Sequence, residues 1–93
     1  MIRIEWHDEK ATENYLKHRI RFEDAKSVFD DSLAVTKPNS IVNGEERWQT
    51  TGLGKTGILL FVIHTIQENG TEIIRIISAR KPTTGEREDY ELG

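Results

Sequence analysis

The stretch Glu45–Arg80, EERWQTTGLGKTGILLFVIHTIQENGTEIIRIISAR, decides the fold of this chain. Three segments in it, 45–51, 57–65 and 72–79, are rich in β-branched and aromatic residues or alternate apolar with polar ones, which indicates strands. Glycine-rich sequence separates the first two segments, and Asn69-Gly70, a strong hairpin signal, precedes the third. Successive strands joined by short turns predict an antiparallel meander.

The flanking sequence supplies the other elements. Upstream we expect a strand over 2–6, a helix over 9–17 with Asp8 as its N-cap, a helix over 22–29 and a short strand over 33–36. The stretch 37–40, KPNS, is typical of a turn. Downstream, Pro82 ends the last strand, and Thr83 with Glu86 forms a capping box for a final helix over 84–92.

The element order is therefore β-α-α-β-β-β-β-α. Helices grouped before an antiparallel meander favour an α+β fold with helices on one face of the sheet. A length of 93 residues suits a single domain, which we assign to residues 1–93.

Composition excludes several classes of protein. The formal net charge is −3, with 13 Lys and Arg against 16 Asp and Glu, which disfavours a general nucleic-acid binder. There is no cysteine, and the three histidines lack metal-ligand spacing. The longest apolar run, residues 58–63, is too short to span a bilayer, and no signal-peptide pattern is present at the start. We expect a cytoplasmic protein that does not bind membranes.

Two basic groups stand out against this acidic background, one at residues 17–21 and one at 75–87. In a regular strand Arg75 and Arg80 would face opposite sides of the sheet, with Arg80 freer at the strand end. By the same alternation Arg47 points away from Trp48, which we expect to face the helices. The arginines either form a site for an anion or make structural ion pairs with Glu46, Glu72 and Glu86.

Guanidinium groups without metal ligands suit an RNA phosphodiester, because they match phosphate oxygens geometrically. Cleavage without a metal can use the RNA 2′-hydroxyl as the internal nucleophile, and it then needs a base, cations for the intermediate and an acid. His18, in the first basic group, is a candidate base; the alternative is that it only caps a helix C-terminus.

Three stretches, IEWHDEKATENYLKHRIRFEDAKSVFDD, GEERWQTTG and IIRIISARKPTTGEREDYE, occur in this order and together span most of the chain between Ile4 and Glu91. In order and spacing they resemble the BrnT family of type II toxins. The W-x-x-x-K…N-x-x-K-H start, the F-E-D-A-x-x-V-F segment, and R-I-I-S-A-R followed by E-R-x-x-Y carry the resemblance.

The resemblance implies a RelE-like α+β fold and a metal-independent, ribosome-independent endoribonuclease that needs no cofactor and inhibits translation. It also implies neutralisation by a BrnA-like ribbon-helix-helix antitoxin, with operator DNA contacted only through that antitoxin. The alternative is a catalytically inactive module of the same fold that serves as antitoxin partner and transcriptional co-repressor.

Site residues are carried over by position. The catalytic candidates are Arg80, Arg75, Glu46, His18 and Arg47, and the RNA-binding candidates are Lys17, Arg19, Arg87 and Tyr90, with no metal ligand. Arg75 and Arg80 would hold the scissile phosphate, and Glu46 or His18 would be the base. Lys17 or Arg47 would neutralise charge, and Tyr90 would stack on a base or donate a proton. Arg19 stands where the family often has Gly.

Overall fold

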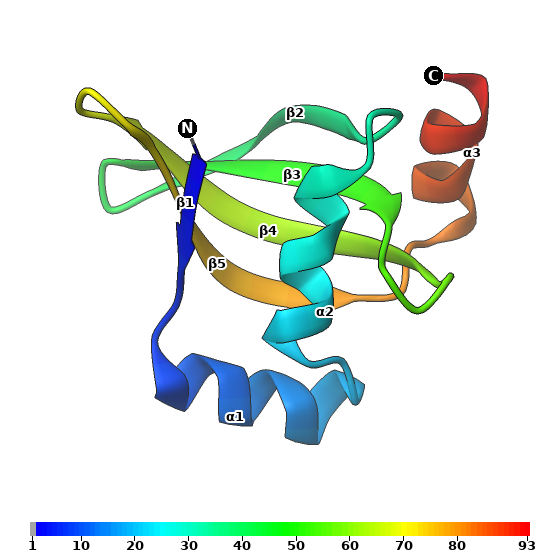
Figure 1. Ribbon diagram of the computed structural model, residues 1–93, viewed down its shortest axis with the longest axis horizontal. Helices are drawn as coiled ribbons and strands as arrows, with labels where there is room; N and C mark the ends of the chain where they lie inside the picture. Colours follow the sequence, from blue (N-terminus) through cyan, green and yellow to red (C-terminus); the bar gives the residue numbers. More distant parts are fainter. Residues whose placement is uncertain (1) are drawn as a thin grey trace.

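A computed structural model describes residues 2–93; Met1, the first residue of the domain assigned to 1–93, lies outside the described residues. The predicted element order is confirmed (Figure 1). The elements are β1 (Ile2–Glu5), α1 (Asp8–His18), α2 (Phe22–Ser27), a 3₁₀ turn η1 (Val28–Asp30), β2 (Val35–Val42), β3 (Glu45–Leu53), β4 (Leu59–Glu68), β5 (Glu72–Arg80) and α3 (Thr84–Leu92).

One sheet with strand order β1-β5-β4-β3-β2 organises the molecule. The predicted meander is confirmed for β2 to β5, which pair antiparallel with their neighbours. β1 pairs with β5 in parallel, from Ile2 opposite Glu72 to Glu5 opposite Arg75, so the sheet is mixed. A parallel pair needs a long crossover, and here α1, α2 and the rest of the meander supply it.

The hydrophobic core lies between one sheet face and the segment from α1 to η1. Figure 1 shows α2 crossing this face, while α1 runs along the edge beside β5. The fully buried side chains include Phe22 and Val28 from the helical segment and Leu60, Val62 and Ile76 from the strands. Burial of such side chains is the main favourable term in folding, about 1.5–3 kcal/mol each.

Trp48 lies on the helix-covered face, as predicted, because it is the register partner of the buried His64. His64 Nδ1 donates to the Thr65 carbonyl at 3.1 Å, which leaves Nε2 to accept from the Thr50 hydroxyl at 2.7 Å. Burial lowers the pKa of His64. The imidazole also packs edge-on against Phe29, so it is a satisfied core histidine.

Two local predictions near the helix and strand ends need correction. The KPNS segment is no turn, because β2 continues through it with a bulge between Pro38 and Ser40. An edge strand tolerates proline because its outward N–H needs no partner. Asp8 is the first residue of α1, and the extended residue before it, His7, is the N-cap. The predicted capping box of Thr83 and Glu86 is confirmed at the start of α3.

Candidate functional site

A β-bulge in β5 places two of the predicted site residues on one face. Ile63 of β4 pairs with Ser78, but the next residue, His64, pairs with Ile76, so Ile77 is the extra residue in β5. As a result Arg75 opposes Thr65 and Arg80 opposes Phe61, and these partners share a face of β4. The expectation that the two arginines face opposite sides is therefore wrong, because it assumed a regular strand.

We call the sheet face that carries Arg47, Arg75 and Arg80 the arginine face; it is opposite the helix-covered face. Arg47 reaches it by the predicted alternation of β3, together with Glu45. Strand spacing puts the Cα atoms of Arg75 and Arg80 about 13 Å apart, four residues of β4. The two arginines are therefore better placed to contact two phosphates along an extended RNA strand than to contact the same phosphate oxygen.

Arg75 is held by Glu45. One terminal nitrogen of Arg75 donates to both carboxylate oxygens, at 2.9 and 2.8 Å. The hydrogen bond from Arg75 lowers the pKa of Glu45, with a smaller contribution from the charge of Arg47. Arg47 lies beside this pair, with Nε 3.6 Å from Glu45, and within residues 2–93 that buried nitrogen has no hydrogen-bond partner.

Arg80 is held from two sides. Its two terminal nitrogens donate to the two oxygens of Glu86 at 2.8 and 3.0 Å, a planar fork against a carboxylate. Its guanidinium carbon lies 4.2 Å from the centre of the Phe61 ring, in cation–π contact. Glu86 also accepts from the Thr83 backbone, and these bonds, chiefly that from Arg80, lower the pKa of Glu86.

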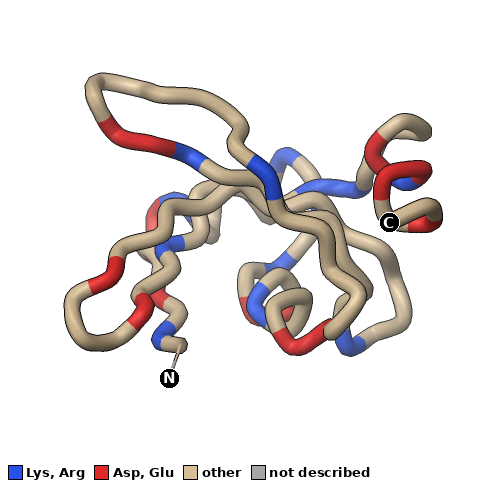
Figure 2. The backbone as a smooth tube through the Cα atoms, turned by 90° about the horizontal axis from the view of Figure 1, so that it is seen from above, with Lys and Arg blue, Asp and Glu red and all other residues tan. Residues whose placement is uncertain are grey.

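The helix α3 is fixed beside the arginine face by two further contacts. Lys37 Nζ donates to Asp89 at 2.6 Å, and the Tyr90 hydroxyl donates to Asp31 at 2.7 Å. Asp31 also accepts from the backbone of Leu53 at 2.8 Å. This backbone bond and the Tyr90 bond lower the pKa of Asp31, and the same Tyr90 contact raises the pKa of Tyr90. In Figure 2 acidic residues lie on α3 and at the β2–β3 turn, and others lie at the β4–β5 turn and on the helical segment.

The first basic group, at the end of α1, borders the same region. Lys17, His18 and the β5 residues Ile77 and Ser78 line one hollow of about 220 Å³ between α1 and the sheet edge. Ser78 lies on the arginine face, because it comes two positions before Arg80 and pairs with Ile63, which shares a face of β4 with Phe61, the partner of Arg80. The hollow therefore brings Lys17 and His18 next to the part of β5 that lies between Arg75 and Arg80.

Within residues 2–93, the remaining candidates make no hydrogen bond or ion pair with Arg75 or Arg80. Glu46 is exposed and alternates to the other side of β3 from Arg47, so the structure separates it from Arg75 and Arg80. Arg19 ends α1 in the left-handed conformation, with φ 58°, and lies over the Tyr15 ring. Arg87 is exposed on α3, and Tyr90 is engaged with Asp31.

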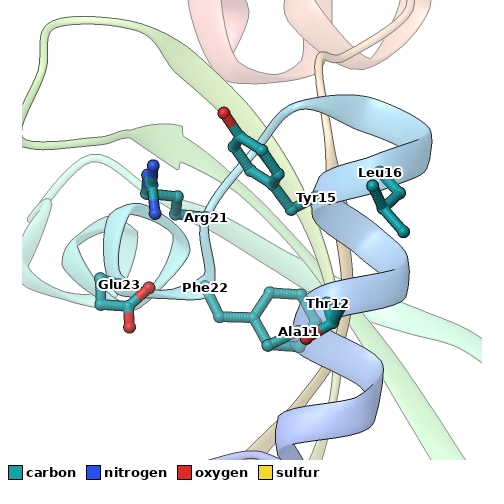
Figure 3. A pocket seen from close by; sticks show the side chains of 7 residues that line it. All are labelled: Ala11, Thr12, Tyr15, Leu16, Arg21, Phe22 and Glu23. Atoms are coloured by element: carbon teal, nitrogen blue, oxygen red, sulfur yellow. The ribbon is translucent and has the colours of Figure 1, made fainter.

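A different hollow lies between α1 and α2 and contains none of the predicted site residues. It has a volume of about 270 Å³ and is shown in Figure 3, where the ring of Tyr15 and the side chains of Arg21 and Phe22 surround it. The Arg21 guanidinium carbon lies 4.8 Å from the centre of the Tyr15 ring. Its largely apolar lining offers no constellation for acid–base chemistry.

Sequence reasoning missed two residues of the arginine face. Glu45 is the carboxylate that engages Arg75, and alternation in β3 already put it on the side of Arg47. The contact between Phe61 and Arg80 depends on the register between β4 and β5, for which the sequence carried no signal.

Within residues 2–93 there is no group of three His, Cys, Asp or Glu placed to hold a metal ion. No helix in the described part of the chain has the length and apolar character to cross a membrane.

Comparison with known proteins identifies the family and the fold of this chain. Residues 6–86 match the family model described as the ribonuclease toxin, BrnT, of type II toxin-antitoxin systems. Among solved structures, the Brucella abortus ribonuclease toxin BrnT is similar, with a TM-score of 0.60 and 22% identity over 90% of this chain and 100% of that one. That likeness shows a shared fold. A search of curated proteins finds no match. The chain belongs to the BrnT family of ribonuclease toxins of type II toxin-antitoxin systems, which implies an RNA substrate and a cognate antitoxin.

Proposed function

We propose that the arginine face is the RNA-cleaving site of this toxin, with Arg80 and Arg75 binding the phosphodiester backbone. The observation that carries the proposal is the β5 bulge, which puts both arginines on one face next to Arg47. Guanidinium groups are the side chains best matched to phosphate oxygens. Because Glu45 and Glu86 occupy the arginines in the free protein, the RNA phosphates displace these carboxylates on binding.

We propose His18 as the base. It lines the same hollow as Ser78, which lies between the two arginines on the arginine face. Glu45 and Glu86 are poor bases because their pKa values are lowered by the arginines. In the proposed step the RNA 2′-oxygen attacks phosphorus and its proton passes to His18. The bond to the 5′-oxygen breaks, and a proton from solvent completes the leaving hydroxyl. Lys17, at the same hollow, neutralises charge on the phosphate.

The proposed reaction uses neither a metal ion nor the ribosome, because the nucleophile is the RNA's own 2′-hydroxyl and the cations are side chains. The deciding experiment incubates purified protein with RNA in EDTA, without ribosomes. We expect cleavage, and no cleavage at a site that carries a 2′-deoxy sugar. Arg80→Ala is expected to lower kcat/KM by about 100- to 1,000-fold, as for loss of one charge-stabilising donor.

The matched control is Arg21→Ala, since Arg21 is an exposed arginine at the start of α2 that lies over the Tyr15 ring, on the other side of the sheet from the arginine face. This variant should cleave at the wild-type rate. If the folded wild type leaves RNA intact under these conditions, the second candidate applies: an inactive member that acts as antitoxin partner and co-repressor. The observation that favours this candidate is the neutralisation of both arginines by carboxylates.

The identity of the base is tested by single-turnover cleavage with His18→Gln. The glutamine keeps a polar side chain of similar size but cannot take the proton of the 2′-hydroxyl as a base. We expect this variant to cleave at least tenfold more slowly than the wild type at pH 7.5, within the usual effect of a general base. A wild-type rate in the variant would assign the base elsewhere.

We further propose that the antitoxin is of the ribbon-helix-helix class and that this chain contacts operator DNA only through the antitoxin. We propose that the toxin acts in the cytoplasm, where it slows translation. The net charge of −3 supports an indirect contact, because direct DNA binding requires many phosphate-neutralising cations. In a gel-shift experiment operator DNA should be retarded by the toxin–antitoxin complex and not by the toxin alone. Retardation by the toxin alone would contradict this part of the proposal.

A further inference from the structure

The outer edge of β5 changes its partner halfway along the strand. β1 covers this edge only from Glu72 to Arg75, where it ends at Glu5. Beyond that point α1 lies alongside the edge, as Figure 1 shows. Backbone groups of a buried strand edge need hydrogen-bond partners, because an unpaired buried N–H or C=O costs about 1–3 kcal/mol.

Asn14 of α1 supplies those partners at Ala79. Its side-chain oxygen accepts from the Ala79 N–H at 3.0 Å, and its amide nitrogen donates to the Ala79 carbonyl at 2.8 Å. The same nitrogen donates to the carbonyl of Ile20 at 3.1 Å. The residue is 6% exposed, so these three bonds are largely shielded from water. One amide thus replaces a neighbouring strand for one residue of β5.

The contact between Asn14 and Ala79 is important because it lies directly after the bulge in β5. The bulge residue Ile77 lies between Arg75, where β1 ends, and Ala79. A one-residue slip in this segment would send every following side chain to the other face of the sheet. Asn14 can make both bonds only when residue 79 presents its N–H and C=O to the edge, which is the register that puts Arg80 on the arginine face.

We infer that Asn14 is a positioning residue for RNA cleavage: it locks the bulged register of β5 and so keeps Arg80 on the arginine face. The inference rests on the proposed role of Arg80 at that face. Asn14 touches the backbone of the residue before Arg80 and makes no hydrogen bond to the Arg80 side chain. Asn14 also lines the hollow that contains Lys17 and His18, but its amide is committed to the backbone of Ala79 and Ile20, so we assign its effect on the reaction to the position of Arg80.

Asn14→Asp tests the inference with almost no change of shape. An ionised Asp still accepts from the Ala79 N–H, but it cannot donate to the Ala79 and Ile20 carbonyls. We expect kcat/KM at pH 8 to fall by about a hundredfold, the usual effect of misplacing a reacting group by about 1 Å. The assay is run well below the melting temperatures of all variants, so that only folded protein is compared.

The pH profile separates positioning from stability alone. A buried carboxyl has a raised pKa, and its protonated form regains one O–H donor for the Ala79 carbonyl. The activity of Asn14→Asp relative to wild type should therefore recover as the pH is lowered from 8 to 5.5. If Asn14→Asp does not fold at pH 8, Asn14→Ser, which keeps one hydroxyl donor and acceptor, takes its place at pH 8 with an expected loss of at least tenfold.

Val28→Ala is the control for destabilisation. Val28 is fully buried in the core under the sheet, and its apolar side chain cannot hydrogen-bond to the edge of β5. It should have a lowered melting temperature and wild-type activity. Amide hydrogen exchange at Ala79 should be accelerated in the Asn14 variant and not in this control.

Two results would overturn the inference, and a third would point elsewhere. Full activity of the folded Asn14 variant at pH 8 would overturn it, as would an equal loss of activity in Val28→Ala. If Arg80→Ala itself remains active, the proposed site fails, and the result is distinguishable from failure of the Asn14 inference alone.

Discussion

Arg75 and Arg80 lie five positions apart on β5, yet they oppose Thr65 and Phe61, which lie four positions apart on one face of β4. The single extra residue, Ile77, makes the difference and converts two arginines of opposite orientation into a pair on one surface. Each is held by a carboxylate from another element, Glu45 of β3 or Glu86 of α3. In the free protein both arginines of this surface are therefore engaged in ion pairs.

A shared substrate should couple the two arginines. We expect Arg75→Ala and Arg80→Ala each to lower kcat/KM, and the double variant to lose less than the sum of the two effects in free energy. Residues that bind one substrate act as a unit and depart from additivity by about 0.5–3 kcal/mol. The cycle of Arg80→Ala with Arg21→Ala is the reference, since Arg21 lies at the start of α2, on the helix-covered side, and should behave additively. Strict additivity of Arg75 and Arg80 would show that they serve different functions.

The two neighbouring carboxylates of β3 should behave differently. Glu45→Gln frees Arg75 from a competing anion, so the Kd for RNA should fall by about two- to fivefold, in line with the weak energies of exposed ion pairs. Glu46→Gln, on the other side of the strand, should leave both Kd and kcat unchanged. Fluorescence-anisotropy binding and single-turnover cleavage measure the two quantities. A large loss of kcat in Glu46→Gln would restore Glu46 as the base.

Arg19 holds a backbone conformation that suits glycine. Its φ of 58° is left-handed, and a residue with a Cβ atom pays about 1–2 kcal/mol for it. Arg19→Gly should raise the free energy of unfolding by about 1 kcal/mol, measured by urea denaturation. Asn43→Gly is the control, because Asn43 also has a positive φ, 52°, but asparagine tolerates it. A lower stability of Arg19→Gly would mean that the contact with Tyr15 outweighs the strain.

Stability should decrease in acid in two steps. The pKa of His64 is lowered in the folded state, so below its ordinary value of 6.5 the unfolded chain binds a proton that the folded chain does not. The pKa values of Asp31 and Glu86 are lowered from 3.8 and 4.5, so their contributions are present above those values and are lost as the pH falls through the folded pKa values.

The melting temperature should therefore be highest above about pH 7, decline modestly below 6.5 and decline again below about 4. Calorimetric scans between pH 3 and 8 measure this profile. In Glu86→Gln the second decline should be smaller, because one of the carboxylates that must be protonated is absent. An identical acid limb in this variant would mean that the pair of Arg80 and Glu86 adds nothing to folding stability.

Much of the architecture could be derived from local patterns. The element order, the capping box of Thr83 and Glu86 and the side of β3 on which Arg47 and Trp48 lie follow from periodicity and capping rules. These features depend on interactions between residues a few positions apart in the sequence, so the sequence is sufficient to predict them. The same holds for the basic residues at the end of α1, although their nearness to β5 was not predictable.

The amino-acid pattern thus established an α+β chain with arginines on its last strand and a basic helix end. It could not establish that those groups share one surface. That outcome depends on the pairing of β4 with β5, where Ile77 is left over, and on Asn14, which meets Ala79 from 65 positions away. A bulge is decided by the contacts on both sides of a strand, and alternation along one strand carries no information about its partners.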